Sequence, residues 1–355
     1  MSGSVLYGFH NLKDVFSERL TDVNAETVST AIQASVDEHN RQINALMGLF
    51  AERTTQFKTR FKTIGNFRLQ PLDENGRARP IKPSGYYDVA FPIRDAGTAW
   101  GATYKALAKM TVEDANNVTA AMLKADASWL RDQMLAALFA SASYSYVDEQ
   151  HGTLTVQPLA SGDSVPYLRT GDTSASADTH QLATADAVAD ATDPVQTIVD
   201  ELKEHPENDG DVVMLVPSNL IADFRDLTLF HAEADPNIRR GANTDEVVGS
   251  LGVAVPGEIK GYHEAGAWIA EWKNLPSNYV IATTTGAAKA LGMREEPETQ
   301  LQGFHLAAER NDHPFYESQW VRFAGFGAYN RVGALVMRFG NGTYATPTGY
   351  APPIV

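Results

Sequence analysis

A basic segment with strand periodicity limits what this chain can fold into more than any other feature. Lys58, Arg60 and Lys62 alternate with other residues and would share one face of a strand. An Asn-Gly pair at positions 75–76, which is preferred in hairpin turns of type I′, follows, and the return segment alternates again. Prolines on both sides of this turn disfavour a central position in a sheet. The sequence therefore predicts a long, basic, two-stranded hairpin within residues 54–101.

This hairpin is too long to be stable by itself. Each arm of about 15 residues, at ~3.3 Å per residue, reaches roughly 50 Å, whereas a compact body of this size has a radius of gyration of about 20 Å. A lone ribbon is marginal in water, so it must lie along the body or dock on a partner. Residues 53–109 carry a net charge of +7 and residues 110–250 one of −17, which favours pairing of the two regions within or between subunits. An unevenly charged, solvated surface is the alternative.

Helical periodicity is strongest over residues 111–142. Thr111 followed by Asp114 is an acidic variant of the capping box, and apolar residues including Trp129 recur every three or four positions. About 30 residues at ~1.5 Å per residue give a rod of roughly 45 Å, with an apolar stripe wide enough to pack on a sheet. A second helix is predicted from Asn24 onward.

The remainder of the chain has the pattern of a mixed α/β unit. Residues 157–193 are rich in Ser, Thr, Ala, Asp and Gly and predict a long surface excursion. Asp193 with Pro194 predicts the capped start of another helix. Residues 212–216 are continuously apolar and predict a strand buried on both faces. Further strands are predicted over residues 247–255, 267–272, 279–283, 319–326 and 332–339.

Composition excludes several classes of protein. The chain has 355 residues, a net charge of −15 and no cysteine, so disulfides and thiolate chemistry are excluded. The strong negative charge argues against a dedicated nucleic-acid binder. No apolar run approaches 18 residues, and the first residues lack the pattern of a signal peptide, so neither a membrane span nor a secretion signal is expected.

No pattern of catalytic residues is found. The nine histidines are scattered, and none forms HExxH or a close pair at metal-ligand spacing. No GxSxG elbow or GxGxxG fingerprint is present. The acidic residues between Asp178 and Asp193 would allow a divalent ion, although a solvated loop is the simpler interpretation. We therefore predict no catalytic residue, no cofactor, no metal site and no enzymatic activity.

The order of the elements resembles the major capsid proteins of tailed double-stranded DNA viruses, which share the Hong Kong 97 fold. Residues 54–101 look like the extended loop (E-loop) of that family, and residues 111–142 look like its spine helix. The strand and following Pro-Ser-Asn-Leu of residues 212–220 are similar to the start of the axial domain. The strands predicted over residues 319–326 and 332–339 look like the C-terminal return.

The resemblance implies an α+β fold of the Hong Kong 97 type, with an N-terminal arm, an E-loop, a peripheral domain with a long spine helix, and an axial α/β domain. The implied divisions are residues 1–53 for the arm and first helix, 54–101 for the E-loop, 102–193 for the peripheral domain with spine helix 111–142 and a surface excursion, 194–295 for the axial domain, and 296–355 for the return strands and C-terminus.

The resemblance also implies a function. We expect a structural major capsid protein that is assembled in the host cytoplasm into the hexamers and pentamers of an icosahedral virion head. The expected partners are the chain itself, packaged double-stranded DNA bound without sequence specificity, and portal, scaffolding and decoration proteins, with no membrane. The acidity fits, because many phosphate contacts would hinder release of the DNA. An encapsulin-type nanocompartment shell protein is one alternative, and a soluble α/β enzyme built on residues 212–216 is the other.

In that fold the E-loop lies across the neighbouring subunit, so its residues are candidates for an inter-subunit contact. Its basic side chains are expected to meet carboxylates of the adjacent subunit, and its apolar side chains are expected to add to the contact. The basic candidates are Arg68, Arg77, Arg79 and Lys82, and the apolar candidates are Tyr87, Val89 and Phe91.

Overall fold

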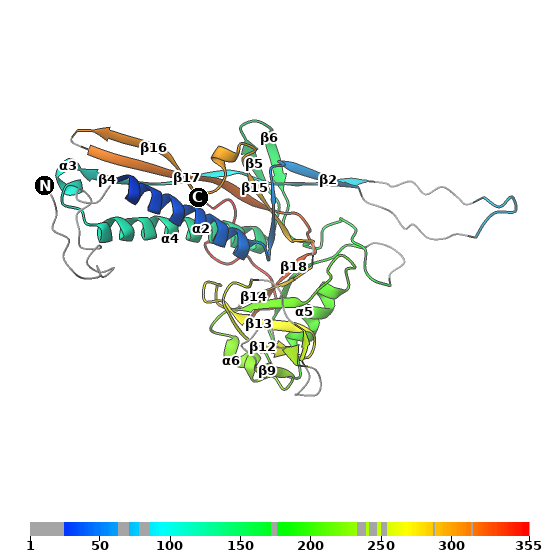
Figure 1. The fold of residues 1–355 in the computed structure, drawn as a ribbon. Helices are drawn as coiled ribbons and strands as arrows, with labels where there is room; N and C mark the ends of the chain where they lie inside the picture. The colour runs from blue at the N-terminus through cyan, green and yellow to red at the C-terminus, as the bar shows by residue number, and fades with distance from the viewer. Residues whose placement is uncertain are drawn as a thin grey trace. The chain divides into compact units, whose positions relative to one another are not determined.

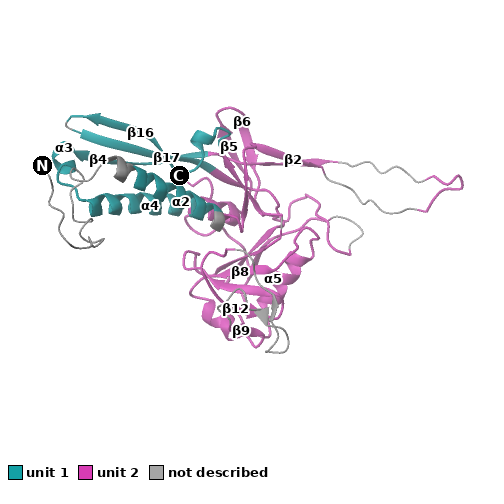
Figure 2. Ribbon diagram, in the orientation of Figure 1, with its two compact units in different colours: residues 1–44, 94–131, 296–324 teal, residues 45–93, 132–295, 325–355 magenta. Residues whose placement is uncertain are grey.

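The computed structural model describes residues 25–62, 71–77, 85–171, 176–232, 239–240, 247–249, 254–286, 288–313 and 315–354. The chain folds into two compact units and passes between them repeatedly (Figure 2). Unit 1 comprises residues 1–44, 94–131 and 296–324, and unit 2 comprises residues 45–93, 132–295 and 325–355. Each unit therefore joins segments that lie far apart in the sequence. In the described part of the chain, no helix combines the length and apolarity needed to cross a membrane.

Unit 1 combines long antiparallel strands with helices (Figure 1). Strand β17 (Phe315–Ala328) runs antiparallel to β4 (Arg94–Thr103) on one edge and to β16 (His305–Asp312) on the other. The helical elements are α2 (Ala25–Met47), α3 (Tyr104–Leu107), α4 (Val112–Phe139) and η1 (Thr299–Leu301), of which α2 and α4 continue into unit 2.

The first turn of α4 has the predicted cap. The backbone N–H of Asp114 donates to Thr111 Oγ1 at 3.2 Å, and the backbone N–H of Thr111 donates to Asp114 Oδ2 at 3.0 Å. Two N–H groups that helical bonds leave free are thereby satisfied, as in a capping box. The helix predicted over residues 111–142 is present as α4, but it ends at Phe139, three residues before the predicted end.

A small core holds the two long helices of unit 1 to the strands. Val36 of α2 packs with Phe304 and with Trp320 of β17, and Met122 and Leu123 of α4 lie against them. The Phe304 and Trp320 rings stack at 5.7 Å between centroids. Burial of aromatic side chains contributes strongly to stability because of their large apolar area.

Unit 2 contains a seven-stranded sheet in the order β7-β18-β14-β8-β13-β12-β9. Its central strand pair, β8 with β13, is parallel, and so is the edge pair β18 with β7, while the other neighbours are antiparallel. The strands are β7 (Gln181–Thr184), β8 (Val212–Val216), β9 (Phe230–Ala232), β12 (Glu258–His263), β13 (Ala267–Glu271), β14 (Tyr279–Thr284) and β18 (Ala334–Phe339).

Helix α5 (Pro194–Lys203) covers one face of this sheet. Asp193 accepts from the N–H groups of the first turn and Pro194 begins the helix, as the sequence predicted. The apolar face of α5 packs in one core with alternate residues of β8, and a short helix, α6 (Ile221–Arg225), follows β8. The continuous burial of β8 confirms the prediction of a strand enclosed on both faces.

Four further pairs of strands complete the architecture. The parallel pair, β1 (Ala51–Thr54) with β15 (Leu291–Glu295), belongs to the five-stranded sheet of β17, because β15 also pairs with β17. The antiparallel pairs are β2 (Lys58–Lys62) with β3 (Tyr86–Ala90), β5 (Tyr144–Asp148) with β6 (Gly152–Val156), and β10 (Arg239–Arg240) with β11 (Val247–Gly249).

The structure corrects the expectation of a surface excursion for part of residues 157–193: residues 185–192 are largely exposed, but several side chains between positions 158 and 184 are buried. Leu159 and His180 are fully buried, and Asp178 is 4% exposed. Strand β7 within this segment forms the parallel edge of the seven-stranded sheet. The polar composition was misleading because the buried Asp and His side chains have partners inside the fold, which a composition argument does not see.

Candidate functional site

The basic hairpin is the first candidate for a functional surface, and strands β2 and β3 form its base. Their register places Arg60 directly opposite Asp88. The Arg60 guanidinium donates to both carboxylate oxygens of Asp88, at 2.7 and 3.0 Å, and Lys58 Nζ lies 3.2 Å from Asp88 Oδ2. The hydrogen bond from Arg60 holds the pKa of Asp88 below its ordinary value. Part of the basic charge is thus compensated within the hairpin itself.

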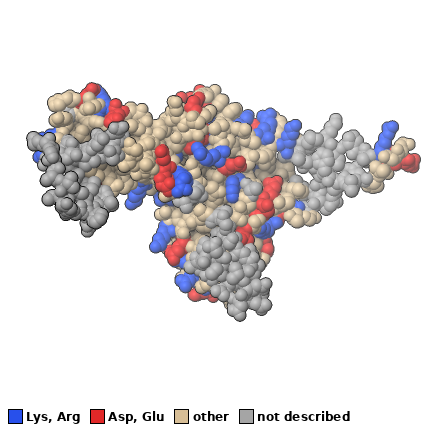
Figure 3. Space-filling model, in the orientation of Figure 1, with Lys and Arg blue, Asp and Glu red and all other residues tan. Residues whose placement is uncertain are grey.

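An aromatic side chain extends this polar face. Tyr86 is 64% exposed, and the Arg60 guanidinium lies 4.2 Å from its ring centroid. Such a stacked arginine is held in place while its remaining N–H donors stay available. Figure 3 shows basic side chains gathered on the described part of the hairpin. The face presents cations and an aromatic ring, which together suit a surface of carboxylates.

The opposite face of the hairpin is packed inside its own chain. The Phe61 ring stacks on Tyr87 at 5.3 Å and meets Tyr329 edge-on at 5.5 Å. Val89 and Phe91 are fully buried. The candidate contact surface is corrected accordingly: Val89 and Phe91 belong to the chain's own core, and only the half-buried Tyr87 among the apolar candidates reaches the surface.

Two glycines let the base of the hairpin lie close to the body of unit 2. A Cβ at Gly292 would come within 2.5 Å of the Phe91 ring, and one at Gly327 would come within 2.4 Å of the Ala90 carbonyl oxygen. Any side chain at these two positions would push the hairpin away. The base is therefore fixed by packing, which the alternating pattern of the sequence did not reveal.

A buried ion pair also anchors the base. Arg294 Nη1 donates to the Phe91 carbonyl at 3.0 Å and to Asp148 Oδ2 at 2.7 Å. Burial raises the pKa of Asp148, but the Arg294 bond and the N–H groups of His151 and Gln150 lower it by more, so it stays below its ordinary value. This pair joins the hairpin, the β5–β6 pair and β15 within unit 2.

The turn of the hairpin differs in type from the prediction. The Gly76 N–H donates to the Asp73 carbonyl at 2.9 Å, and the Asp73 N–H donates to Arg77 O at 3.0 Å. Gly76 has φ 73°, whereas Asn75 does not adopt positive φ. A type I turn followed by a glycine bulge fits this pattern, and type I′ would need positive φ at two residues.

The predicted basic contacts are only partly described. Arg77 lies in the exposed turn, and its backbone N–H donates to Asp73 Oδ1 at 2.7 Å. The other three basic candidates lie outside the described residues: Arg68, Arg79 and Lys82. The surface seen on the described part comprises Lys58, Arg60, Tyr86 and Arg77, of which the sequence analysis named Arg77 alone as a contact.

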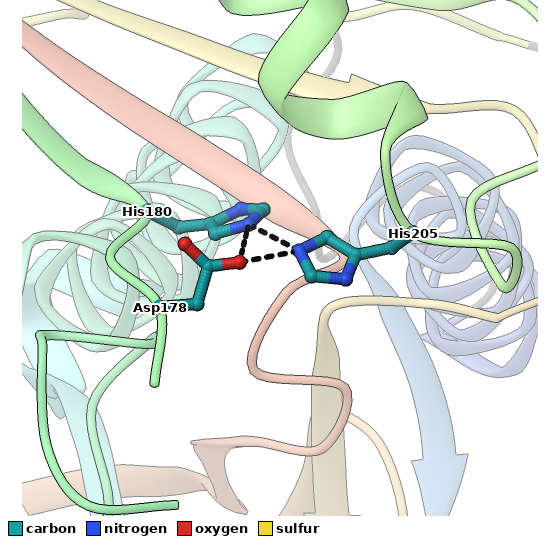
Figure 4. Close-up of side chains that lie close together, drawn as sticks. All are labelled: Asp178, His180 and His205. Carbon is teal, nitrogen blue, oxygen red and sulfur yellow. Dashed lines mark hydrogen bonds and ion pairs between the residues drawn. The ribbon is translucent and has the colours of Figure 1, made fainter. Parts of the chain in front are cut away.

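A second polar cluster was not anticipated from the sequence. Asp178, His180 and His205 converge inside unit 2, and all three are buried (Figure 4). His205 Nε2 lies 2.7 Å from Asp178 Oδ2 and 3.1 Å from His180 Nε2. Burial lowers the pKa of His205, but Asp178, the Leu168 carbonyl and the charge of Glu204 together raise it by more, so the net shift is upward. The separation of 25 positions between the two histidines hid this pairing from any spacing motif.

Comparison with known proteins gives one informative likeness. No protein-family model and no curated protein matches the chain. A solved structure of Mycobacterium phage Patience matches with a TM-score of 0.67 and 18% identity over 99% of each chain. The capsid of a native GTA particle is also similar, with a TM-score of 0.49 and 12% identity over 84% of this chain and 90% of that one. The capsid of cyanophage P-SCSP1u has a TM-score of 0.49 and 11% identity over 82% of this chain and 87% of that one. The first likeness shows a shared fold from end to end.

Proposed function

We propose that this chain, which has the Hong Kong 97 fold, is a structural major capsid protein that assembles with copies of itself into a closed virus shell. One observation carries the proposal: the likeness to the Mycobacterium phage Patience structure extends over 99% of both chains. A likeness over whole chains includes the hairpin and long helices as well as the α/β sheet. An enzyme built on a common sheet would share only that sheet.

The base of the hairpin supports this role. It is anchored to its own chain through one face, by Phe91 and the Arg294–Asp148 pair. Its other face carries exposed Arg60 and Tyr86. A ribbon fixed at its base and polar along one face can bind a neighbouring copy without changing its own core. We infer that hexamers and pentamers of an icosahedral head use this contact.

The net charge supports a container for DNA in preference to a DNA-binding protein. Because each chain carries a net charge of −15, the shell would enclose double-stranded DNA without recognising its sequence and without binding many of its phosphates. The proposed partners are therefore the chain itself and the packaged DNA, together with portal, scaffolding and decoration proteins, and the proposed location is the virion.

Sedimentation of the purified chain tests the proposal. We expect fast-sedimenting closed particles, seen by negative-stain electron microscopy, when the chain is expressed alone or with its scaffolding partner. Particles taken from infected cells should contain nuclease-protected double-stranded DNA. A chain that stays monomeric under both conditions would contradict the proposal, and particles filled with protein cargo in place of DNA would favour the nanocompartment alternative.

A further inference from the structure

Asp178, His180 and His205 form a buried cluster in which the N–H groups of both neutral imidazole rings point away from the centre. No hydrogen-bond donor of the two rings therefore faces the centre. His180 Nδ1 lies 3.0 Å from the Ala334 carbonyl oxygen, and His205 Nδ1 lies 3.0 Å from the Leu168 carbonyl oxygen. A carbonyl oxygen only accepts, so each Nδ1 carries the proton. In the neutral rings both Nε2 atoms therefore present lone pairs, and these two atoms face each other at 3.1 Å.

The third atom at this centre is a carboxylate oxygen of Asp178, which faces two acceptor atoms when both imidazole rings are neutral. Asp178 is 4% exposed, and its Oδ1 accepts from Arg169 at 2.9 Å and from the Thr179 N–H at 2.6 Å. With both rings neutral, its Oδ2 faces the lone pairs of His205 Nε2 at 2.7 Å and His180 Nε2 at 3.7 Å, and no other donor among the described residues reaches it. A buried acceptor that lacks a donor needs another counterpart, such as an ion.

We propose that Asp178, His180 and His205 bind a divalent transition-metal ion, with Zn²⁺ as the best match. Tetrahedral zinc with bonds of about 2.0–2.2 Å places its ligand atoms about 3.3 Å apart. The three separations in the cluster, 2.7, 3.1 and 3.7 Å, lie around that value. The Nδ1–H bonds to backbone carbonyls are the outer contacts that fix a metal-binding tautomer.

Glu204 supplies the fourth ligand in this proposal. Its Oε1 is buried, lies 3.6 Å from His205 Nε2, and forms an ion pair with Arg169 Nε at 3.1 Å that falls outside hydrogen-bond geometry. The charge is also suitable, because Asp178, Glu201 and Glu204 group around the site with Arg169 as the neighbouring cation. Three carboxylates and one guanidinium leave an excess of about two negative charges, which a divalent ion neutralises.

A second His–Asp pair in the same chain, with a half-buried His39 and a buried Asp126, shows a carboxylate whose counter-charge is already present. His39 Nε2 lies 2.8 Å from Asp126 Oδ2, but Arg322 donates to both oxygens of Asp126, at 2.5 and 2.8 Å. The cation is thus already present, as a guanidinium. In the Asp178 cluster Arg169 reaches only one carboxylate oxygen, and the other is left facing two imidazoles.

The proposed ion would attach the segment before β7 to the end of α5. Asp178 and His180 precede β7, the edge strand of the seven-stranded sheet, and His205 directly follows α5. Binding to the folded state alone would raise the stability of unit 2 with metal concentration. We assign the ion a structural role, because the three ligand residues are buried and no reaction is assigned to the site.

Metal titration of the full chain tests this inference. After chelator treatment and gel filtration, the chain should take up about one equivalent of Zn²⁺, measured by elemental analysis, and its melting temperature should rise with added ZnCl₂. His180→Gln and His205→Gln should each lower the zinc affinity by more than about tenfold. The matched control is His231→Gln, because His231 also pairs with a carboxylate, Glu264 at 2.7 Å, but is exposed. It should bind zinc as the wild type does.

A spectroscopic measurement on the wild-type chain keeps the test decisive if the variants do not fold. Co²⁺ in a four-coordinate site of nitrogen and oxygen ligands should give intense visible absorption that Zn²⁺ abolishes. MgCl₂ should not compete, because imidazole ligands do not suit that ion. Less than about a tenth of an equivalent of zinc, or only the weak absorption of hydrated Co²⁺, would overturn the proposal and assign the cluster to a shared proton. Equal losses in His205→Gln and His231→Gln would also overturn it.

Discussion

Asp126 and Arg322 hold together three elements of unit 1 through one buried ion pair. Arg322, which is 1% exposed, lies on β17, Asp126 lies on α4, and Asn40 of α2 accepts from Arg322 at 2.7 Å. Asn40 in turn accepts from the Phe304 N–H at 2.9 Å. A polar network of this kind is stabilising only while every member is paired.

Removal of the acid should therefore be costly. We expect Asp126→Ala to lower the free energy of unfolding by about 3–5 kcal/mol, because Arg322 would remain buried without a counter-charge. The double variant Asp126→Leu with Arg322→Met should recover most of that loss. Glu113→Ala, at an exposed position of the same helix, should change stability by less than about 0.5 kcal/mol. Urea unfolding of disassembled subunits measures the stability of all three variants. A double variant no more stable than Asp126→Ala would contradict this interpretation of the ion pair.

The Asp148–Arg294 pair predicts a dependence of stability on acid. The pKa of Asp148 in the folded chain lies below its ordinary value, so the ionised form favours folding. The stabilisation is complete above about pH 4, the ordinary pKa of an aspartate, and is lost as the pH falls through the lowered folded value.

Asp148→Asn should remove this part of the pH dependence. The variant should be less stable at pH 7, because Arg294 loses its counter-charge, and its stability should change less between pH 5 and pH 2 than that of the wild type. Urea midpoints measured across that range give the comparison. An unchanged slope in the variant would mean that Asp148 does not titrate as described.

Several individual side chains show where reasoning from the sequence stops. The predicted apolar stripe of α4 included Trp129, yet this residue is only partly buried, while Leu130 and Met134 of the same helix are fully or almost fully buried. Helical periodicity predicts the buried face of a helix only to within about one residue on either side. The element that packs against the helix decides which edge of that face is buried. Asp126 interrupts that face, and its partners Arg322, 196 positions away, and His39 explain it.

The hairpin is the element whose charge can be tested most simply. Arg77 lies in the exposed turn. Reversal to glutamate at both Arg77 and Arg79 should leave a folded subunit, because the turn adds nothing to the core. The same change should sharply reduce shell formation. One exposed ion pair contributes only about 0.2–1 kcal/mol, but a contact repeated in every subunit of a closed shell adds up.

The control for this experiment keeps the charge. Arg77→Lys with Arg79→Lys should assemble nearly as well as the wild type, and raised salt should weaken assembly of both, because exposed charges are screened over about 10 Å at 0.1 M. Circular dichroism with sedimentation separates folding from assembly. Normal shells from the glutamate variant would exclude docking by charge, and a misfolded glutamate variant would place the turn within its own subunit.

Local pattern predicted the long elements well and the short ones poorly. The helices α4 and α5 and the strand β8 were predictable because caps and unbroken apolar periods are local signals. Strand β7 was not, since its four residues of mixed character, Gln181–Thr184, carry no period, and their strand is defined by pairing with the distant β18. The buried base of the hairpin was also missed, because the close approach of Phe91 depends on Gly292, two hundred positions later.

For the whole molecule, the order of the elements carried more information than any motif. Identity to the Mycobacterium phage Patience structure is only 18%, yet the fold matches over the full chain. Many sequences satisfy the same pattern of caps, periods and turns, so the fold persists where individual residues do not. The division into two units was not predictable in detail, because each unit consists of three segments that are separated in the sequence by segments of the other unit.

A three-dimensional reconstruction of the particle by electron cryomicroscopy tests the central claim most directly. We predict a closed icosahedral shell of this chain in which the hairpin of each subunit lies on a neighbouring subunit. Arg60 and Arg77 should face carboxylates of that neighbour. A shell in which the hairpin contacts only its own subunit, or a chain that forms no closed particle with its scaffolding partner, would contradict it.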